Sequence, residues 1–168
     1  MIPEAIRLVR STFAQLLPVA DLAADLFYDR LFSLDPALRR RFAANLDAQK
    51  QALMAALGLV VGYLDRTEEL VPIVEKLGLR HAGYGLQAAH YATVGSALLW
   101  TLEQGLGPAF TPAVRAAWRD VFDMLATTMR TDAESAGPVT DDEGSERQEV
   151  SYQRKVAWCG GRSICAMR

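Results

Sequence analysis

The chain has 168 residues, of which 51% are hydrophobic, and its formal net charge is -2 at pH 7. This length and composition are sufficient for one domain with a well-filled core. A weakly negative chain offers no electrostatic basis for binding nucleic acid or an anionic membrane surface. Because no apolar run reaches the roughly 18–20 residues of a bilayer span, we also expect no transmembrane helix.

Two further features of the sequence favour a reducing cytoplasm. The first residues, Met1 to Glu4, lack the basic start and apolar middle of a signal peptide. The cysteines, Cys159 and Cys165, both lie near the C-terminus, so the expected folded part has no disulfide framework. As a metal or redox pair these two cysteines give only a weak signal, because no second pair or histidine accompanies them.

Apolar residues recur at helical spacing from Pro3 to about Met129, and alternating apolar and polar runs do not occur, so we predict an all-α fold. The expected helical segments run from about Pro3 to Leu17, Ala20 to Leu34, Pro36 to Phe42 as a short turn, Leu46 to Leu64, Thr67 to His81, Gln87 to Leu106, and Thr111 to about Met129. After Ala133 the sequence becomes polar and loses periodicity. We therefore expect a folded domain over residues 1–132 and a disordered, flexible tail over residues 133–168.

Each expected helix carries a stripe of residues that the pattern places in the core. In chain order these stripes include Ile6, Val9, Phe13 and Leu17; Ala24, Phe27, Tyr28 and Leu31; Leu53, Leu57, Val60 and Leu64; Tyr91, Leu98 and Leu102; and Val114, Trp118, Val121 and Leu125. The acidic residues of the second helix, among them Asp25 and Asp29, fall on its solvent side.

His81 is the polar residue with the clearest chemical potential. It continues the stripe of Leu70, Val74 and Leu77, at offsets of four, seven and eleven residues from Leu70. A histidine directed into a core needs partners for its ring nitrogens. One partner is a backbone carbonyl, which the spacing alone favours; the other is a metal, for which haem iron is the best candidate.

Other polar residues also fall on inward faces. Gln49 either lies at the rim of the core or donates a hydrogen bond into a cavity, and the rim is the more frequent outcome. The hydroxyl of Tyr28 either donates to a ligand or bonds a backbone group, as most inward tyrosines do. Tyr91 either approaches the imidazole of His81 or packs in the core. His90 is expected at the surface.

Several segments, in this order and at these separations, resemble the globin family, and within it the bacterial single-domain haemoglobins and the haem domain of flavohaemoglobins. They are Leu26 to Phe32 continuing through Pro36 to Phe42, Gln49 to Leu53, Leu79 to Gly85, and Ala89 to Gly95 followed by Leu98 and Leu99. The resemblance covers about Ile2 to Met129. It implies a globin fold, which is a three-on-three helical sandwich around haem.

The resemblance also implies a cofactor and a set of residues that hold it. The cofactor is haem b (iron protoporphyrin IX), with His81 as the proximal iron ligand. Phe42 would pack on the porphyrin, and Tyr28, Gln49 and Leu53 would line the distal side. The implied positions on the proximal and inner haem surface are Leu86, Tyr91 and Val94.

The function implied by the resemblance is reversible binding of dioxygen, with carbon monoxide and nitric oxide as further ligands, for oxygen binding or transport or for gas handling. The alternatives are a nitric oxide dioxygenase or a gas or redox sensor. In flavohaemoglobins a glutamate of the last helix supports the proximal histidine; its place falls near Ala133, with Asp132 and Glu134 as neighbours. The residues after Ala133 are too few for a reductase domain, so turnover would need a separate reductase partner.

Overall fold

A computed structural model describes residues 2–42, 45–83 and 88–135, except for the side chains of residues 41, 79–83, 88 and 131–135. Within these ranges the elements are α1 (Pro3–Leu16), η1 (Leu17–Val19), α2 (Ala20–Leu34), η2 (Pro36–Leu38), α3 (Arg39–Phe42), α4 (Leu46–Tyr63), α5 (Thr67–Gly83), α6 (Ala88–Leu106), η3 (Gly107–Ala109) and α7 (Pro112–Ser135). No strand occurs in these ranges, so the all-α prediction is confirmed.

Local sequence signals explain several of these boundaries. The side chain of Asn45 accepts a hydrogen bond from the amide of Ala48 at 3.1 Å and thereby caps α4. The hydroxyl of Thr111 accepts one from the amide of Val114 at 3.3 Å at the start of α7. Gly107 directly follows α6 with a φ of 51°, a left-handed conformation that costs glycine little.

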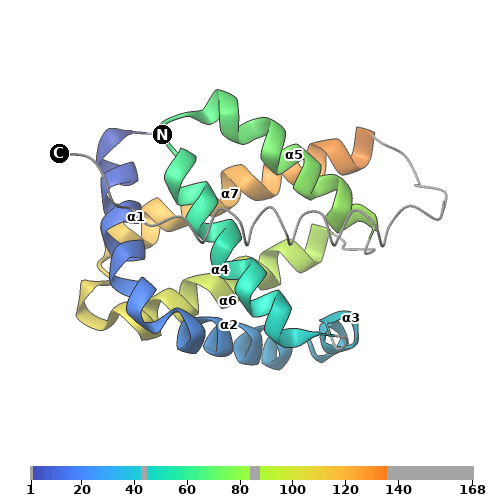
Figure 1. Ribbon diagram of the computed structural model, residues 1–168, viewed down its shortest axis with the longest axis horizontal. Helices are drawn as coiled ribbons and strands as arrows, with labels where there is room; N and C mark the ends of the chain where they lie inside the picture. The colour runs from blue at the N-terminus through green and yellow to red at the C-terminus, as the bar shows by residue number, and fades with distance from the viewer. Residues whose placement is uncertain (1, 43–44, 84–87, 136–168) are drawn as a thin grey trace.

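The helices pack mainly in two pairs, α5 against α7 and α2 against α6. Figure 1 shows α4 crossing over α6 and α7 on its way from the α2 side of the molecule to the start of α5. α1 packs on α7 and α4, and α2 packs on the first half of α4 through Tyr28 and Lys50. None of the described helices is both long and apolar enough to cross a membrane.

The core joins side chains from every long described helix. Trp118 of α7 is 1% exposed, and its indole nitrogen donates a hydrogen bond to the hydroxyl of Thr12 in α1 at 3.0 Å. Leu31 of α2 and Leu102 of α6 are also almost fully buried. Trp118, Leu31 and Leu102 lie on predicted apolar stripes, and Thr12 hydrogen-bonds to Trp118. The stripes of α2 and α7 therefore face the core, as the sequence predicts.

Two details of the helices differ from expectation. Leu17 is exposed and Leu16 is buried, because α1 ends at Leu16 and the chain turns into a 3-10 helix that contains Pro18. The last helix continues to Ser135, past its expected end near Met129 and past the boundary drawn at residue 132. Residues 136–168, which make up the rest of the expected tail, lie outside the described part of the chain.

Candidate functional site

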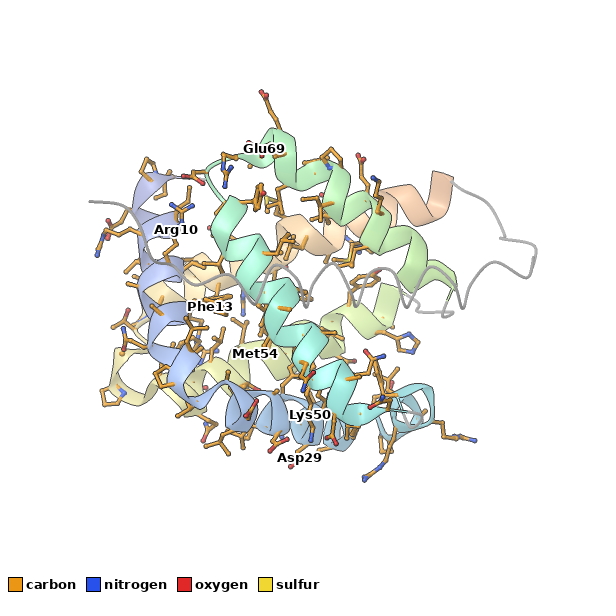
Figure 2. The ribbon with its side chains drawn as sticks, viewed as in Figure 1. Arg10, Phe13, Asp29, Lys50, Met54 and Glu69 are labelled. Carbon is orange, nitrogen blue, oxygen red and sulfur yellow. The ribbon has the colours of Figure 1, made fainter. Side chains whose placement is uncertain are left out.

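From Leu46 to Leu59, α4 presents an apolar face that the rest of the protein covers only partly. Between Leu46 and Leu59 no residue is fully buried, and the buried residues of this helix are Val60 and Val61. Nevertheless Leu53 and Leu57 pack against the core, as does Met54, which Figure 2 labels. An apolar face left half-covered is the kind of surface that binds an apolar ligand.

Apolar side chains of other elements share this half-buried character. Phe42 of α3, Val94 of α6, and Phe122 and Met129 of α7 all pack against the core without being fully buried. A porphyrin ring is flat, broad and mostly apolar, and it needs such side chains on both of its faces. The residues present therefore fit haem in their chemistry.

Tyr28 lies at the centre of the predicted distal residues. Its ring is 5% exposed and lies 5.6 Å from the ring of Phe42 and 5.8 Å from that of Phe32, measured between centroids. Its hydroxyl donates a hydrogen bond to the main-chain oxygen of Gln49 at 3.2 Å. Of the two alternatives for this tyrosine, the structure has the bond to a backbone group.

Burial also fixes the protonation state of this hydroxyl. Removal from water disfavours the charged phenolate, and this raises the pKa of Tyr28 to about 12. The group is therefore a neutral hydrogen-bond donor throughout the physiological pH range. A neutral donor beside an apolar face can orient a polar ligand without adding a charge.

Gln49 and Leu53 lie one turn apart near the start of α4, and both are half-buried. Tyr28 contacts the main chain of Gln49, so α2 and α4 bring the three predicted distal residues to one region. Phe42 joins them through its ring contact with Tyr28. The predicted distal set is thus brought together in space by elements separated in sequence.

Tyr91 and Val94, which the resemblance assigns to the proximal and inner haem surface, lie in the first turns of α6 and are half-buried. Burial raises the pKa of Tyr91, and the positive charge of Arg130 partly opposes that shift. Beside Val94, Gly95 lets the ring of Phe122 approach closely, since an added Cβ there would lie 2.6 Å from Phe122 Cε1. This contact sets how closely α6 and α7 cross.

His81 belongs to the last turn of α5, and its side chain lies outside the described part of the structure, as does all of Leu86. The stripe that His81 continues is buried at Leu70 and Val74, which are 1% and 3% exposed, and half-buried at Leu77. One turn before His81, an added Cβ at Gly78 would lie 2.8 Å from both Cα and the carbonyl oxygen of Met129. This close approach fixes the end of α5 against α7.

His90 is not the free surface residue that the sequence suggested. Its side chain is 17% exposed, and Nε2 lies 3.9 Å from Oδ2 of Asp35. Asp35 also accepts a hydrogen bond from the amide of Ala37 at the start of η2. Helix periodicity could not predict this contact, because the contact depends on where α6 meets the end of α2.

Sequence reasoning also missed Lys50, the neighbour of Gln49. Its ammonium group lies 2.6 Å from Oδ1 of Asp25 in α2. Asp25 does lie on the solvent side of α2, as predicted, and is half-exposed. The pair could not be read from the sequence, since nothing local indicates that this position of α4 lies over Asp25.

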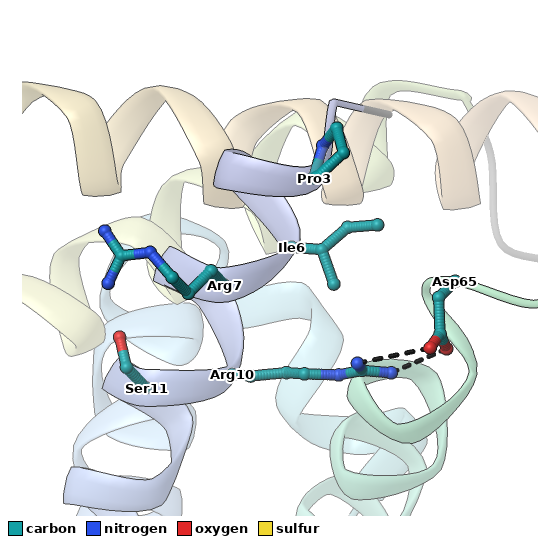
Figure 3. A pocket seen from close by; sticks show the side chains of 6 residues that line it. All are labelled: Pro3, Ile6, Arg7, Arg10, Ser11 and Asp65. Carbon is teal, nitrogen blue, oxygen red and sulfur yellow. Dashed lines mark hydrogen bonds and ion pairs between the residues drawn. The ribbon is translucent and has the colours of Figure 1, made fainter.

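In the described part of the protein, one hollow is too small for a macrocycle, and another lies away from the predicted distal residues. A cavity of about 20 Å³ borders Leu53 and Leu57 on their core side, together with Thr101, whose buried hydroxyl has no hydrogen-bond partner there. A groove of about 640 Å³, which Arg10 crosses to pair with Asp65 (Figure 3), is lined by Pro3, Ile6, Arg7, Arg10, Ser11 and Asp65. Neither hollow is lined by a histidine that could bind haem iron.

Comparisons with known proteins identify the family of this chain. The family model described as Globin matches residues 25–129. A flavohemoprotein of Bordetella parapertussis is 33% identical over 127 residues, which cover 74% of this chain and 32% of that protein. An uncharacterized globin-like protein of Aquifex aeolicus is 30% identical over 128 residues, which cover 76% of this chain and 91% of that one. The chain therefore spans about a third of the flavohemoprotein and most of the globin-like protein.

Solved structures with the same fold extend these matches. An engineered carbene transferase, derived from a proposed nitric oxide dioxygenase of Rhodothermus marinus, is similar with a TM-score of 0.73 and 26% identity, covering 81% of this chain and 95% of that one. A bacterial globin of Campylobacter jejuni has a TM-score of 0.69 and 20% identity, over 80% of this chain and 98% of that one, and shows the fold. Together with the family model, these matches establish that the chain belongs to the globin family.

Proposed function

We propose that this globin binds dioxygen reversibly at haem b held by residues 1–132, in a reducing cytoplasm, with residues 133–168 as a tail outside the haem site. The observation that carries the proposal is the half-covered apolar face of α4, with the neutral hydroxyl of Tyr28 directed at its first turns. Carbon monoxide and nitric oxide are the further ligands that we assign to the same site.

Haem, when bound, supplies an iron with an open coordination position at which diatomic gases bind reversibly. We assign His81 as the protein ligand to that iron and Phe42 as the aromatic contact on the porphyrin. Leu53 excludes water from the distal side, while Tyr28 and Gln49 donate hydrogen bonds there. On the proximal and inner surface we assign Leu86, Tyr91 and Val94 as lining residues.

A visible spectrum tests this proposal. The protein purified with haem is expected to show a Soret band that shifts when the iron is reduced and shifts again when carbon monoxide or dioxygen is added. The shift with dioxygen should reverse when the gas is removed. A purified protein that takes up no haem from a stoichiometric supply would contradict the proposal.

Substitution of the distal donors is expected to speed dioxygen release. Tyr28→Phe and Gln49→Leu each remove one hydrogen bond, worth about 1–1.5 kcal/mol or roughly tenfold in rate. Flash photolysis and stopped-flow measurements should give faster dioxygen dissociation with much smaller changes for carbon monoxide, which is less polar when bound. Equal changes for both gases would instead indicate altered access or packing.

A nitric oxide dioxygenase with a separate reductase is the second candidate, because the similar Rhodothermus marinus structure derives from a proposed enzyme of that kind. The curated flavohemoproteins also resemble this chain over a part of their length. The discriminating measurement is steady-state nitric oxide consumption with an added reductase. Consumption that stops after one equivalent per haem would favour gas binding over catalysis.

A further inference from the structure

Two neighbouring residues of α4 tie the start of this helix to α2. The main-chain oxygen of Gln49 accepts the hydrogen bond of Tyr28 at 3.2 Å, and the ammonium group of Lys50 lies 2.6 Å from Oδ1 of Asp25. Figure 2 shows Lys50 where the lower end of α4 passes over α2. Because no residue from Leu46 to Leu59 is fully buried, these polar contacts add to the partial core packing of Leu53 and Leu57.

The acidic residues around the ammonium group of Lys50 favour its charged form. Asp47 lies 3.8 Å from its ammonium group, and the charge of Asp29 also acts on it. The hydrogen bond to Asp25 is the main cause that raises the pKa of Lys50, and the acidic neighbours add to it. Lys50 is therefore charged throughout the physiological pH range.

The tie through Tyr28 is different, because a phenol hydroxyl has a single proton to donate. In the structure the main-chain oxygen of Gln49 accepts that hydrogen bond. When a ligand accepts the hydrogen bond of Tyr28, the main-chain oxygen of Gln49 loses it. The start of α4 then loses one of its two polar contacts with α2. At the same time the side chain of Gln49 has to be positioned to donate its hydrogen bond to the ligand.

We propose that the Lys50–Asp25 ion pair is a positioning element of the distal side, which holds the first turns of α4 on α2 while the Tyr28 hydroxyl turns from Gln49 to a bound ligand. The proposal rests on the proposed gas-binding function. Lys50 and Asp25 do not touch the ligand; they act through the position of Gln49. Loss of the pair should change the release of dioxygen, which accepts the hydrogen bond of Tyr28, more than the release of carbon monoxide.

The test compares variants that remove one charge of the pair with a matched variant at the other end of α4. Lys50→Met and Asp25→Asn break the Lys50–Asp25 pair, whereas Lys50→Arg keeps its charge. Asp65→Asn is the control, because Asp65 also forms a 2.6 Å ion pair, with Arg10 of α1. In that control Arg10 keeps its hydrogen bonds to the main-chain oxygens of Val61 and Gly62.

Three readouts are taken on the full chain. Hydrogen exchange of residues 49–53, measured with and without haem, is expected to speed up roughly two- to fivefold in Lys50→Met and Asp25→Asn, the range that a partly exposed ion pair permits. Dioxygen dissociation should speed up by a similar factor and the infrared band of bound carbon monoxide should broaden. Lys50→Arg should leave all three close to those of the unsubstituted protein, and Asp65→Asn should alter none of them.

Unchanged exchange over residues 49–53 in both charge-removing variants would overturn the proposal, as would faster exchange with unchanged dioxygen release. An equal effect of Asp65→Asn would also overturn it, because the pair would then contribute only general stability. Failure of the gas-binding function has a separate signature, namely a chain without a Soret band. The exchange measurement on the haem-free protein still decides whether the pair holds the start of α4.

Discussion

Replacement of His81 by alanine is expected to abolish tight haem retention, with a loss of affinity on the order of 100-fold or more. Even removal of a group that only supports a metal ligand commonly costs 10–100-fold, and removal of the ligand itself should cost at least as much. Haem transfer to an excess of an apoglobin acceptor, followed by the decay of the Soret band, measures this loss. Added imidazole should restore part of the original spectrum in His81→Gly.

His90→Ala is the matched control for this prediction, because His90 is the other histidine of the chain. It belongs to the first turn of α6, where its ring lies next to Asp35, and it is not on the stripe of Leu70 and Val74. We expect this variant to retain haem with an unchanged spectrum. Tight haem in His81→Ala, or loss of haem in His90→Ala alone, would show that the ligand was assigned to the wrong histidine.

Gly78→Ala is expected to destabilise the protein by about 1–3 kcal/mol and to weaken haem retention. Alanine is the better helix former by up to about 1 kcal/mol, so propensity alone predicts a gain. The added Cβ, however, would lie 2.8 Å from backbone atoms of Met129, which cannot rotate away. The end of α5 must then move off α7, and His81 follows one turn later. Urea unfolding and the haem transfer assay measure the two effects.

Gly62→Ala separates the clash from helix propensity. Gly62 is also helical, in α4, but nothing lies within 4 Å of the position that a Cβ would take. This variant should therefore be stabilised by about 0.5–1 kcal/mol and should keep its haem. Stabilisation of both variants would mean that α5 and α7 separate without cost, and that their close approach does not position His81.

Much of the helical architecture could be predicted from the sequence, because it depends on interactions between residues a few positions apart. The cap at Asn45 and the left-handed Gly107 are local features, and they explain where α4 begins and α6 ends. The period of the apolar residues likewise identified the faces that carry Trp118 and Leu31 into the core. The distal residues came from the resemblance to globins, and the structure brings Tyr28, Gln49 and Phe42 into one region.

The partners of the polar side chains were decided by the tertiary structure alone. Helix periodicity gives the direction of Lys50 from its own axis, but not that Asp25 of another helix lies 2.6 Å away. In the same way it did not indicate which backbone group the Tyr28 hydroxyl would meet, and the crossing of α2 and α4 places the main-chain oxygen of Gln49 there. Such choices depend on the angle and separation at which helices cross, which are set by packing over the whole core and not by neighbouring residues.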